Sequence, residues 1–274
     1  MAGDPPLITL TTDFGLSDEY VGVMKGVLAG RAPLARIIDL CHAVPPQDIR
    51  HAAYLLAASW RYFPAATLHV VVVDPGVGSD RRVILLDTGH GRFLAPDNGV
   101  LTLLLDGPGQ RQAHRVTDQA LFLTPLSATF HGRDIFAPVA AALANGADPA
   151  TLGPALDPST LIRLPLPQPH IDAAGRTASG EVVAIDHFGN LVTNLHRSHL
   201  SALAIGPERT AVHLDGRCLG TIRATYAEVA PGEALALIGS RDMLEIAVCQ
   251  GNAAAHLQAA IGSRICLAPA PDTK

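Results

Sequence analysis

The sequence predicts an α/β N-terminal domain with a mostly parallel central sheet, followed by an all-β, barrel-like C-terminal domain. Strand-like and helix-like segments alternate up to about residue 150, which is typical of a layered α/β fold. Short β-type segments then recur without long helices, as in a small barrel or antiparallel sheet. We place the first domain at 1–160, a linker at 161–179 and the second domain at 180–274.

The first elements follow from short apolar runs and the residues that bound them. Residues 7–12 read LITLTT and predict a strand that ends at Asp13. Ser17 is placed to cap a following helix, whose apolar stripe consists of Val21, Met24 and Leu28.

The alternation continues through the rest of this half. Residues 36–40 predict a strand, and Asp48 is placed to begin a helix that Pro64 ends. The remaining elements are strands at 67–73 and 83–88, a turn at 95–99 that opens a short helix, and an Ala-rich helix at 134–145.

The second half differs in composition. Residues 154–180 are rich in Pro, Gly and Ala and too irregular in pattern for a regular element, so we expect an interdomain crossover there. Apolar segments of β-type composition then recur between turn residues: EVVAID, LVTNL, TAVHLD, CLGTIR, ALALIG, MLEIAV and RICLAP.

Length and composition exclude several classes of protein. The 274 residues, 48% hydrophobic and 16% charged, can fill a large core or two smaller ones. A net charge of −5 without a Lys/Arg cluster argues against nucleic-acid and anionic membrane partners. Four scattered cysteines without a C-x-x-C pair fit a reducing compartment. Because no signal peptide or membrane-length apolar run is visible, we expect a soluble, cytoplasmic protein.

The stretch VVVDPGVGSDRR, residues 71–82, is the first candidate for a functional site. Its apolar, β-branched start is typical of a strand buried on both faces, and turn residues follow from Asp74 onward. A carboxylate at the C-terminal end of a central strand lies where open α/β sheets bind ligands. Arg81 can fold back over the turn to meet Asp74, although a surface ion pair at a turn fits this stretch equally well.

Other motif-like strings lack the context that their chemistry needs. TDFG at 12–15 has no accompanying catalytic loop or Gly-rich loop of a kinase. The glycines at 76 and 78 lack the third glycine of a dinucleotide motif, and no G-x-S-x-G elbow occurs. The 12 histidines contain no H-x-x-x-H pattern, and a metal site built from separate histidines stays an alternative: His42, His51, His131 and His187.

Six strings, in order, resemble the S-adenosylmethionine hydroxide adenosyltransferase family, whose relatives are the fluorinase and chlorinase. They are TTDFGLSDEYVGVMKG, VVDPGVGSDRR, APDNG, TFHGRDIFAP, IDHFGNLVTN and GNAA, and together they span nearly the whole chain. The resemblance implies hydrolysis of S-adenosyl-L-methionine to adenosine and L-methionine, without a metal or second cofactor. It also implies a homotrimer with active sites between subunits.

The resemblance assigns roles to individual residues. It implies a water-activating triad of Asp74, Arg81 and His131. Asp13 would hold the ribose diol, and Asp18 and Asp186 would face the ammonium group of the methionine moiety. The other implied substrate contacts are Ser240 and Arg241 with the carboxylate, Phe188 and Asn190 with adenine, and Asn252, Ala253 and Tyr226 beside the adenine ring.

Two positions differ from the halogenases. The fluorinase has an aromatic residue where Asp74 stands and a serine where Gly132 stands, and it has an extra loop in its first domain. Gly132 offers a halide no hydroxyl, and Asp74 would place a negative charge beside it, so halogenase activity is the less favoured alternative. Two further alternatives are an adenosyl-ligand binding module without turnover and a metal-dependent hydrolase, which a chelator would inhibit.

Overall fold

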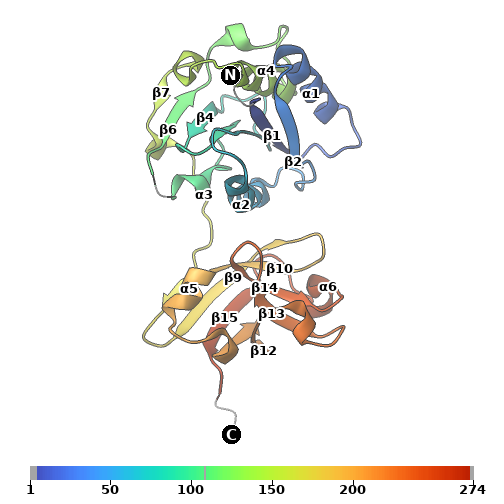
Figure 1. Ribbon diagram of the computed structural model, residues 1–274, viewed down its shortest axis with the longest axis vertical. Helices are drawn as coiled ribbons and strands as arrows, with labels where there is room; N and C mark the ends of the chain where they lie inside the picture. The colour runs from blue at the N-terminus through green and yellow to red at the C-terminus, as the bar shows by residue number, and fades with distance from the viewer. Residues whose placement is uncertain (1–4, 108, 272–274) are drawn as a thin grey trace. The chain divides into compact units, whose positions relative to one another are not determined.

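The computed structural model describes residues 5–107 and 109–271, and its contacts divide the chain into two units between Pro165 and Leu166. The first unit contains helices and a sheet, and most of the regular structure of the second consists of strands (Figure 1). Each unit has its own buried apolar core. Among the described residues, no helix combines the length and the apolar character that crossing a membrane requires.

The first unit is built on a seven-stranded sheet with the order β2-β1-β3-β5-β4-β6-β7. The pairs β1–β2, β1–β3 and β3–β5 are parallel, whereas β4–β5, β4–β6 and β6–β7 are antiparallel. The strands are β1 (Leu7–Thr12), β2 (Arg36–Cys41), β3 (Leu68–Val72), β4 (Val83–Asp87), β5 (Arg92–Pro96), β6 (Gln112–Arg115) and β7 (Ala155–Leu156).

The expected mostly parallel sheet is therefore correct for one half of this sheet and wrong for the other. A parallel connection needs a crossover of a dozen or more residues, and helices provide this between β1, β2 and β3. The link from β4 to β5 contains only residues 88–91, which suffices for an antiparallel hairpin.

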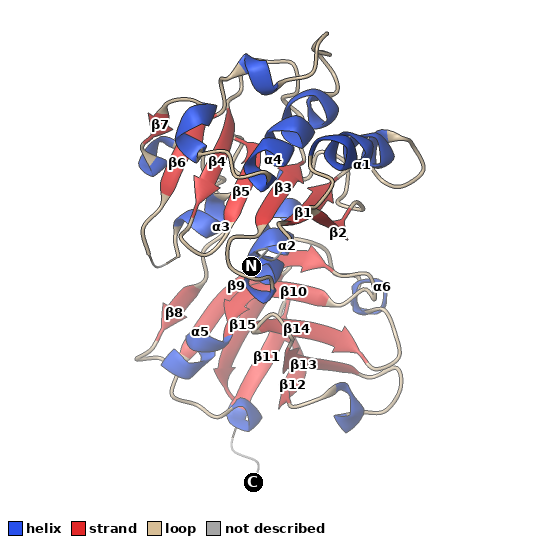
Figure 2. Cartoon of the chain, turned by 45° about the horizontal axis from the view of Figure 1, so that its top comes forward, coloured by secondary structure: helices blue, strands red, loops and turns tan. Residues whose placement is uncertain are grey.

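Helices cover both faces of the sheet. One core packs alternate residues of β1, β3 and β4, such as Leu10, Val72 and Leu85, against α1 and α4. The other packs the opposite face, with Val71 and Ile84, against α2 and α3. The helices, visible in Figure 2, are α1 (Tyr20–Arg31), α2 (Ile49–Ser59), α3 (Thr102–Leu105) and α4 (Ala137–Ala144), and a π-helical turn, η3 (Gly132–Phe136), leads into α4.

Of the two helix N-caps predicted from the sequence, one is correct and one is wrong. Asp48 caps α2, since its side chain accepts a hydrogen bond from His51 N at 2.8 Å. Ser17 does not cap α1, which begins only at Tyr20 with Glu19 at the N-cap and no side-chain cap. The residues before Tyr20 instead form an exposed turn.

The second unit is a closed seven-stranded barrel with one extra strand. The ring runs β9-β10-β14-β13-β12-β11-β15 and returns to β9, and β8 pairs with β9 outside the ring. Apolar side chains such as Val182, Val212 and Ile246 form its core. The strands are β8 (His170–Asp172), β9 (Thr177–Ile185), β10 (Leu191–His196), β11 (Thr210–Leu214), β12 (Arg217–Arg223), β13 (Ala234–Ile238), β14 (Met243–Val248) and β15 (Arg264–Pro269).

The expected all-β, barrel-like fold of the second half is thus correct, but its regular structure begins early. β8 and the first residues of β9 lie within 161–179, which the sequence predicted to be an irregular linker. The unit also has two short helices, α5 (Arg197–Ala202) and α6 (Ala253–Leu257). The 3-10 turns of the chain are η1 (Trp60–Tyr62), η2 (Gln119–Leu121), η4 (Pro149–Leu152), η5 (Pro158–Thr160), η6 (Pro207–Arg209) and η7 (Tyr226–Glu228).

Candidate functional site

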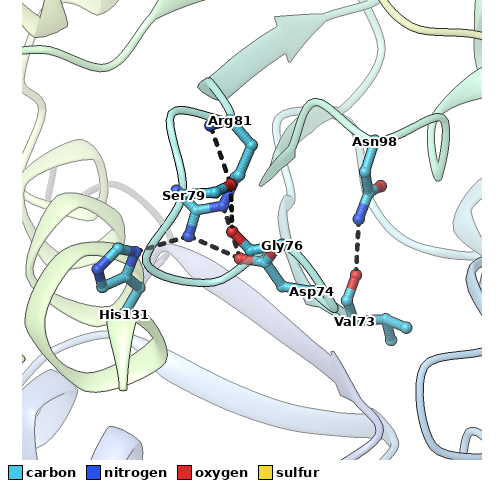
Figure 3. Close-up of polar contacts among 7 residues, drawn as sticks. All are labelled: Val73, Asp74, Gly76, Ser79, Arg81, Asn98 and His131. Carbon is cyan, nitrogen blue, oxygen red and sulfur yellow. Dashed lines mark hydrogen bonds and ion pairs between the residues drawn. The ribbon is translucent and has the colours of Figure 1, made fainter. Parts of the chain in front are cut away.

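The candidate site begins where β3 leaves the sheet. β3 ends at Val72, and the chain then turns through Asp74 and reaches Arg81 just before β4. Within the turn, Ser79 Oγ donates a hydrogen bond to Gly76 O at 2.6 Å and accepts one from Arg81 N at 3.3 Å (Figure 3). These local bonds bring the side chain of Arg81 back to Asp74.

Asp74 and Arg81 form a buried ion pair. Arg81 Nε donates to Asp74 Oδ2 at 2.8 Å, and Arg81 Nη2 lies 2.6 Å from the same oxygen. The Asp74 side chain is 4% exposed and that of Arg81 is 11% exposed. This burial excludes the surface ion pair that the sequence left open. Removing either partner would leave a buried, unpaired charge, which is strongly destabilising.

His131 completes a chain of three side chains. Arg81 Nη2 donates to His131 Nδ1 at 2.7 Å. Because a guanidinium only donates, Nδ1 must be the acceptor, and the neutral ring carries its proton on Nε2. Burial and the charge of Arg81 lower the pKa of His131, although Asp74 and Asp134 act in the opposite direction. A lowered pKa favours the neutral form that this hydrogen bond requires.

One oxygen of these three side chains has no hydrogen-bond partner among the described residues. Asp74 Oδ1 is buried and accepts no hydrogen bond from any described residue. Buried acceptors are nearly always satisfied, so an unsatisfied one marks a place where a water or ligand would complete the bonding. Asp74 also lines the pocket described below.

The segment before His131 is held by two contacts of different kinds. The buried Asp134 carboxylate accepts a hydrogen bond from Ser127 N at 2.7 Å. Gly78, with a φ of +79°, lies so close to the carbonyl of Ala128 that no Cβ would fit between them. The turn that carries Asp74 therefore rests directly on the segment that carries His131.

A pocket of about 370 Å³ opens beside Asp74 and His131 in the first unit. Residues that follow β1 and β3 form its wall, as expected for the C-terminal ends of parallel strands. Its lining consists of Asp13, Phe14, Tyr20, Pro46, Gln47, Val72, Asp74, Pro75, Val77, Thr129, Phe130, His131 and Gly132.

Asp13 and Asp18 lie in different environments. Asp13 lines the pocket, and its Oδ2 accepts a hydrogen bond from Gln47 N at 2.8 Å. Asp18 lies in the exposed turn before α1 and is not part of the lining. The pocket lining therefore contains three of the five first-unit candidates, Asp13, Asp74 and His131, and Arg81 bonds two of them.

Three aromatic residues of the pocket wall were not among the sequence candidates. The rings of Phe14 and Phe130 lie 6.1 Å apart, and Tyr20 lies 5.7 Å from Phe14 and 5.0 Å from Phe130. All three stand inside the motifs that carry the family resemblance. Their position beside charged motif residues was the available signal that they would line a site.

The candidates at 186–190 form a tight turn in the second unit. Asp186 Oδ1 accepts from Phe188 N and Asn190 N, both at 2.9 Å, and Asp186 Oδ2 accepts from Asn190 Nδ2 at 2.9 Å. The Phe188 side chain points outward and is 72% exposed. Gly189, with a φ of +85°, lies against Asn252, whose side chain caps α6 by accepting from Ala255 N.

The remaining second-unit candidates include one buried contact. Tyr226 Oη donates to Glu245 Oε1 at 2.5 Å, and burial, together with this carboxylate, raises the pKa of Tyr226. Ser240 and Arg241 are exposed, and Ala253 is buried at the start of α6. Burial also raises the pKa of Glu245, a residue that the sequence analysis missed because it lies within an ordinary strand pattern.

The histidines do not gather into a metal site in the described part of the chain. No group of three or more His, Cys, Asp or Glu side chains there has a spacing suited to a metal ion. His131 instead bonds Arg81, and His42 bonds Thr12 Oγ1 at 2.8 Å.

Comparison with known proteins supports the resemblance seen in the sequence. Residues 8–153 match the model of the SAM hydroxide adenosyltransferase N-terminal domain, and residues 180–266 match that of its C-terminal domain. A protein of Salinispora tropica named (R)-S-adenosyl-L-methionine hydrolase is 45% identical over 95% of this chain and 97% of its own length.

Two further matches have a lower sequence identity to this chain. A fluorinase of Nocardia brasiliensis is 28% identical over 89% of this chain and 91% of its own length. A crystal structure of a conserved protein from Thermotoga maritima has a TM-score of 0.89 at 35% identity and covers 95% of this chain and 99% of the other. With both domain models matched in order and a relative aligned almost end to end, the chain belongs to the SAM hydroxide adenosyltransferase family.

Proposed function

We propose that this protein hydrolyses S-adenosyl-L-methionine to adenosine and L-methionine, with water attacking C5′ of the ribose. The observation that carries the proposal is the buried chain Asp74–Arg81–His131 at the edge of a pocket, in a member of this family. The related protein of Salinispora tropica, named (R)-S-adenosyl-L-methionine hydrolase, supports hydrolysis of S-adenosyl-L-methionine.

The reaction needs no general acid, but it needs precise positioning of the attacking water. The sulfonium leaves as a neutral thioether when the C5′–S bond breaks, so it needs no proton. The site must hold a water oxygen in line with C5′ while the new C–O bond forms. Proximity and orientation of this kind can supply about 7–11 kcal/mol in favourable cases.

The three side chains have different roles toward the attacking water. His131 Nδ1 is occupied by Arg81, so the Nε2–H of the neutral ring can donate to the water oxygen but cannot take its proton. Asp74 Oδ1 is buried beside the pocket and has no hydrogen-bond partner among the described residues. We assign the water proton to this oxygen, and the neighbouring charge of Arg81 stabilises the anion that forms as the water loses its proton.

The substrate contacts proposed from the family differ in their structural support. Asp13 in the pocket wall suits the ribose diol, since Gln47 N fixes one of its oxygens and leaves the other available. The exposed ring of Phe188 is free to stack on adenine, with Asn190, Asn252, Ala253 and Tyr226 also assigned to adenine.

The amino-acid end of the substrate is assigned to Asp18, Asp186, Ser240 and Arg241. Asp18, Ser240 and Arg241 are exposed and can reach a ligand. Asp186 is the weakest of these assignments, because its carboxylate already accepts three hydrogen bonds within its own turn. We further propose a cytoplasmic homotrimer without a cofactor, in which one subunit's first unit and a neighbour's second unit bind the substrate together.

Halogenation is the second candidate, because fluorinases are among the relatives. Gly132 has no hydroxyl for a halide, and a Cβ at this position would lie only 3.0 Å from Met24 Sδ. The Asp74 carboxylate would in addition repel a halide from the pocket. Both residues favour water as the nucleophile.

The decisive experiment is incubation with S-adenosyl-L-methionine in oxygen-18 water, followed by chromatography and mass spectrometry. We expect methionine and adenosine carrying one solvent oxygen, at a rate that a chelator does not change. S-adenosylhomocysteine or methylthioadenosine would show that another bond breaks. Binding of the substrate without any turnover would support the binding module instead, and inhibition by chelator would support the metal-dependent hydrolase.

A further inference from the structure

A second chain of polar side chains begins at the end of β1, directly before the pocket residues Asp13 and Phe14. Thr12, the last residue of β1, accepts a hydrogen bond from Phe14 N at its Oγ1 over 3.2 Å. The same hydroxyl lies 2.8 Å from Nδ1 of the buried His42. A hydroxyl that accepts from Phe14 N still has its own proton to donate, and with Thr12 as the donor to Nδ1 the ring proton of His42 is on Nε2.

The far side of His42 supports this assignment. His42 Nε2 lies 3.1 Å from Asp39 Oδ1, where a ring N–H is attracted to the carboxylate and a bare lone pair would be repelled. The alignment falls outside hydrogen-bond geometry, so this contact is mainly electrostatic. Asp39 is held in turn by Lys25 Nζ, 2.6 Å from Oδ2. The ring is therefore fixed from both sides.

The same histidine joins two loops of the pocket wall through the backbone. Gly15 N donates to His42 O at 2.8 Å, which ties the segment after β1 to the segment after β2. Those two segments meet again where Gln47 N donates to Asp13 Oδ2 at 2.8 Å. Both segments line the pocket, the first through Asp13 and Phe14 and the second through Gln47.

We propose that His42 is a positioning residue for substrate binding, which acts through Thr12 to hold Asp13 and Phe14 in the pocket wall. It touches neither the Asp74–Arg81–His131 chain nor the pocket itself. Its loss should therefore weaken binding of S-adenosyl-L-methionine and leave the chemical step nearly intact. This inference rests on the proposed function for its substrate.

The same strand provides a matched control. Thr9 Oγ1 lies 2.8 Å from Nδ1 of the buried His69, so the threonine and histidine pair is repeated with the same distance. His69 stacks on Phe93 in the core, with ring centroids 4.9 Å apart, and neither partner lines the pocket. Thr9→Val and Thr12→Val thus remove the same hydroxyl from equally buried positions, but only one of them supports the pocket wall.

The test compares Thr12→Val, His42→Leu and His42→Gln with Thr9→Val. We expect Thr12→Val and His42→Leu to raise KM and the calorimetric Kd for S-adenosyl-L-methionine about tenfold, the effect of one lost hydrogen bond, with kcat changed less than about threefold. His42→Gln should restore most of the affinity, because an amide can accept from Thr12 and donate to Asp39. Thr9→Val should lower the melting temperature without changing KM.

Hydrogen exchange of the free proteins gives a readout that does not depend on turnover. The amides of Phe14, Gly15 and Gln47 should lose protection in His42→Leu and keep it in His42→Gln and Thr9→Val. Equal KM effects for the two threonine variants, or unchanged exchange at these amides in His42→Leu, would overturn the proposal. A wild-type protein that neither binds nor cleaves S-adenosyl-L-methionine would contradict the proposed function, while the exchange result would still decide the role of His42.

Discussion

Arg81 is the residue on which the candidate site depends most. Its Nε and Nη2 both contact Asp74 Oδ2, and Nη2 also bonds His131, so one side chain fixes two others. A lysine has the same charge but a single nitrogen and cannot reproduce this fork. The charge of Arg81 also contributes to the lowered pKa of His131.

At this scale we predict that Arg81→Ala and His131→Ala lower kcat by roughly two to four orders of magnitude, the range typical of acid–base and oxyanion groups. Arg81→Lys should lose nearly as much, because a lysine cannot hold Asp74 and His131 together. Kinetics and calorimetric titration with S-adenosyl-L-methionine would measure both effects. Variants that bind poorly yet turn over normally at saturation would show that these residues are substrate ligands instead.

The pH dependence of kcat follows from His131. Only the neutral ring can accept from Arg81, and burial together with the charge of Arg81 lowers the pKa of His131 below 6.5. We therefore expect kcat to be constant near neutral pH and to fall as the pH drops through this lowered pKa. A kcat profile with a midpoint above 6.5 would contradict the assignment.

The same lowered pKa links folding stability to pH. The unfolded chain binds the proton of His131 more readily than the folded chain, so stability falls as the pH drops below the unfolded value. Denaturant titrations of the wild type and His131→Gln between pH 7 and about pH 5 should show a smaller loss of stability in the variant.

At the scale of residues, the sequence predicts a contact best when both partners lie in one short motif. Asp74 and Arg81 pair as expected, because a Pro-Gly turn leaves little freedom between them. The contact between Arg81 and His131 could be inferred only from the family resemblance, since 50 residues separate the two. The bond between Tyr226 and Glu245 had no sequence signal, because it depends on how the barrel closes.

At the scale of elements, the turn between β3 and β4 is the part of the fold most constrained by the site. It must reverse the chain, bury an ion pair and pack on the segment before His131 within residues 73–82. Gly78 meets the last requirement, since it combines a φ of +79° with contact to Ala128 O. A side chain at this position would push the turn that carries Asp74 and Arg81 away from the segment that carries His131.

We predict that Gly78→Ala lowers kcat by at least tenfold and destabilises the protein by roughly 1–3 kcal/mol through backbone strain and steric conflict. Gly89→Ala is the matched control, because Gly89 has a φ of +78° but open space around its Cβ position. It should carry only the cost of the left-handed backbone, about 1–2 kcal/mol, and leave kcat unchanged. Equal losses of activity in both variants would refute the packing argument.

Element order was predictable from sequence, and strand direction was less so. Apolar runs and turn residues located β1, β3 and β4, but the runs are equally apolar in parallel and antiparallel neighbours. The short 88–91 connection was the available signal for the hairpin. The π-helical turn at Gly132–Phe136 reads like ordinary helix in the sequence, because its apolar pattern continues directly into α4.

At the scale of the whole molecule, the proposed homotrimer predicts complementation between inactive variants. Arg81→Ala leaves the second unit intact, and Arg241→Ala leaves the first unit intact. If each site combines units from two subunits, randomly mixed trimers at equal ratio should recover about one quarter of wild-type activity. Light scattering should show a trimer, and an active monomer or a complete lack of recovery would contradict shared sites.

The closed ring of the second unit limits how such a trimer could be held together. Each ring strand, from β9 to β15, pairs with a neighbour on both sides, although β12 and β13 share only two residue pairs, so the ring leaves little strand edge for another chain to extend. Contacts made by the paired ring strands must come from side chains and loops, while open edges remain at β8 of the same unit and at β2 and β7 of the first unit. If the proposed trimer is held by the outer face of the barrel, substitutions there would change subunit affinity and leave the backbone pairing of the ring intact, so assembly and fold could evolve separately.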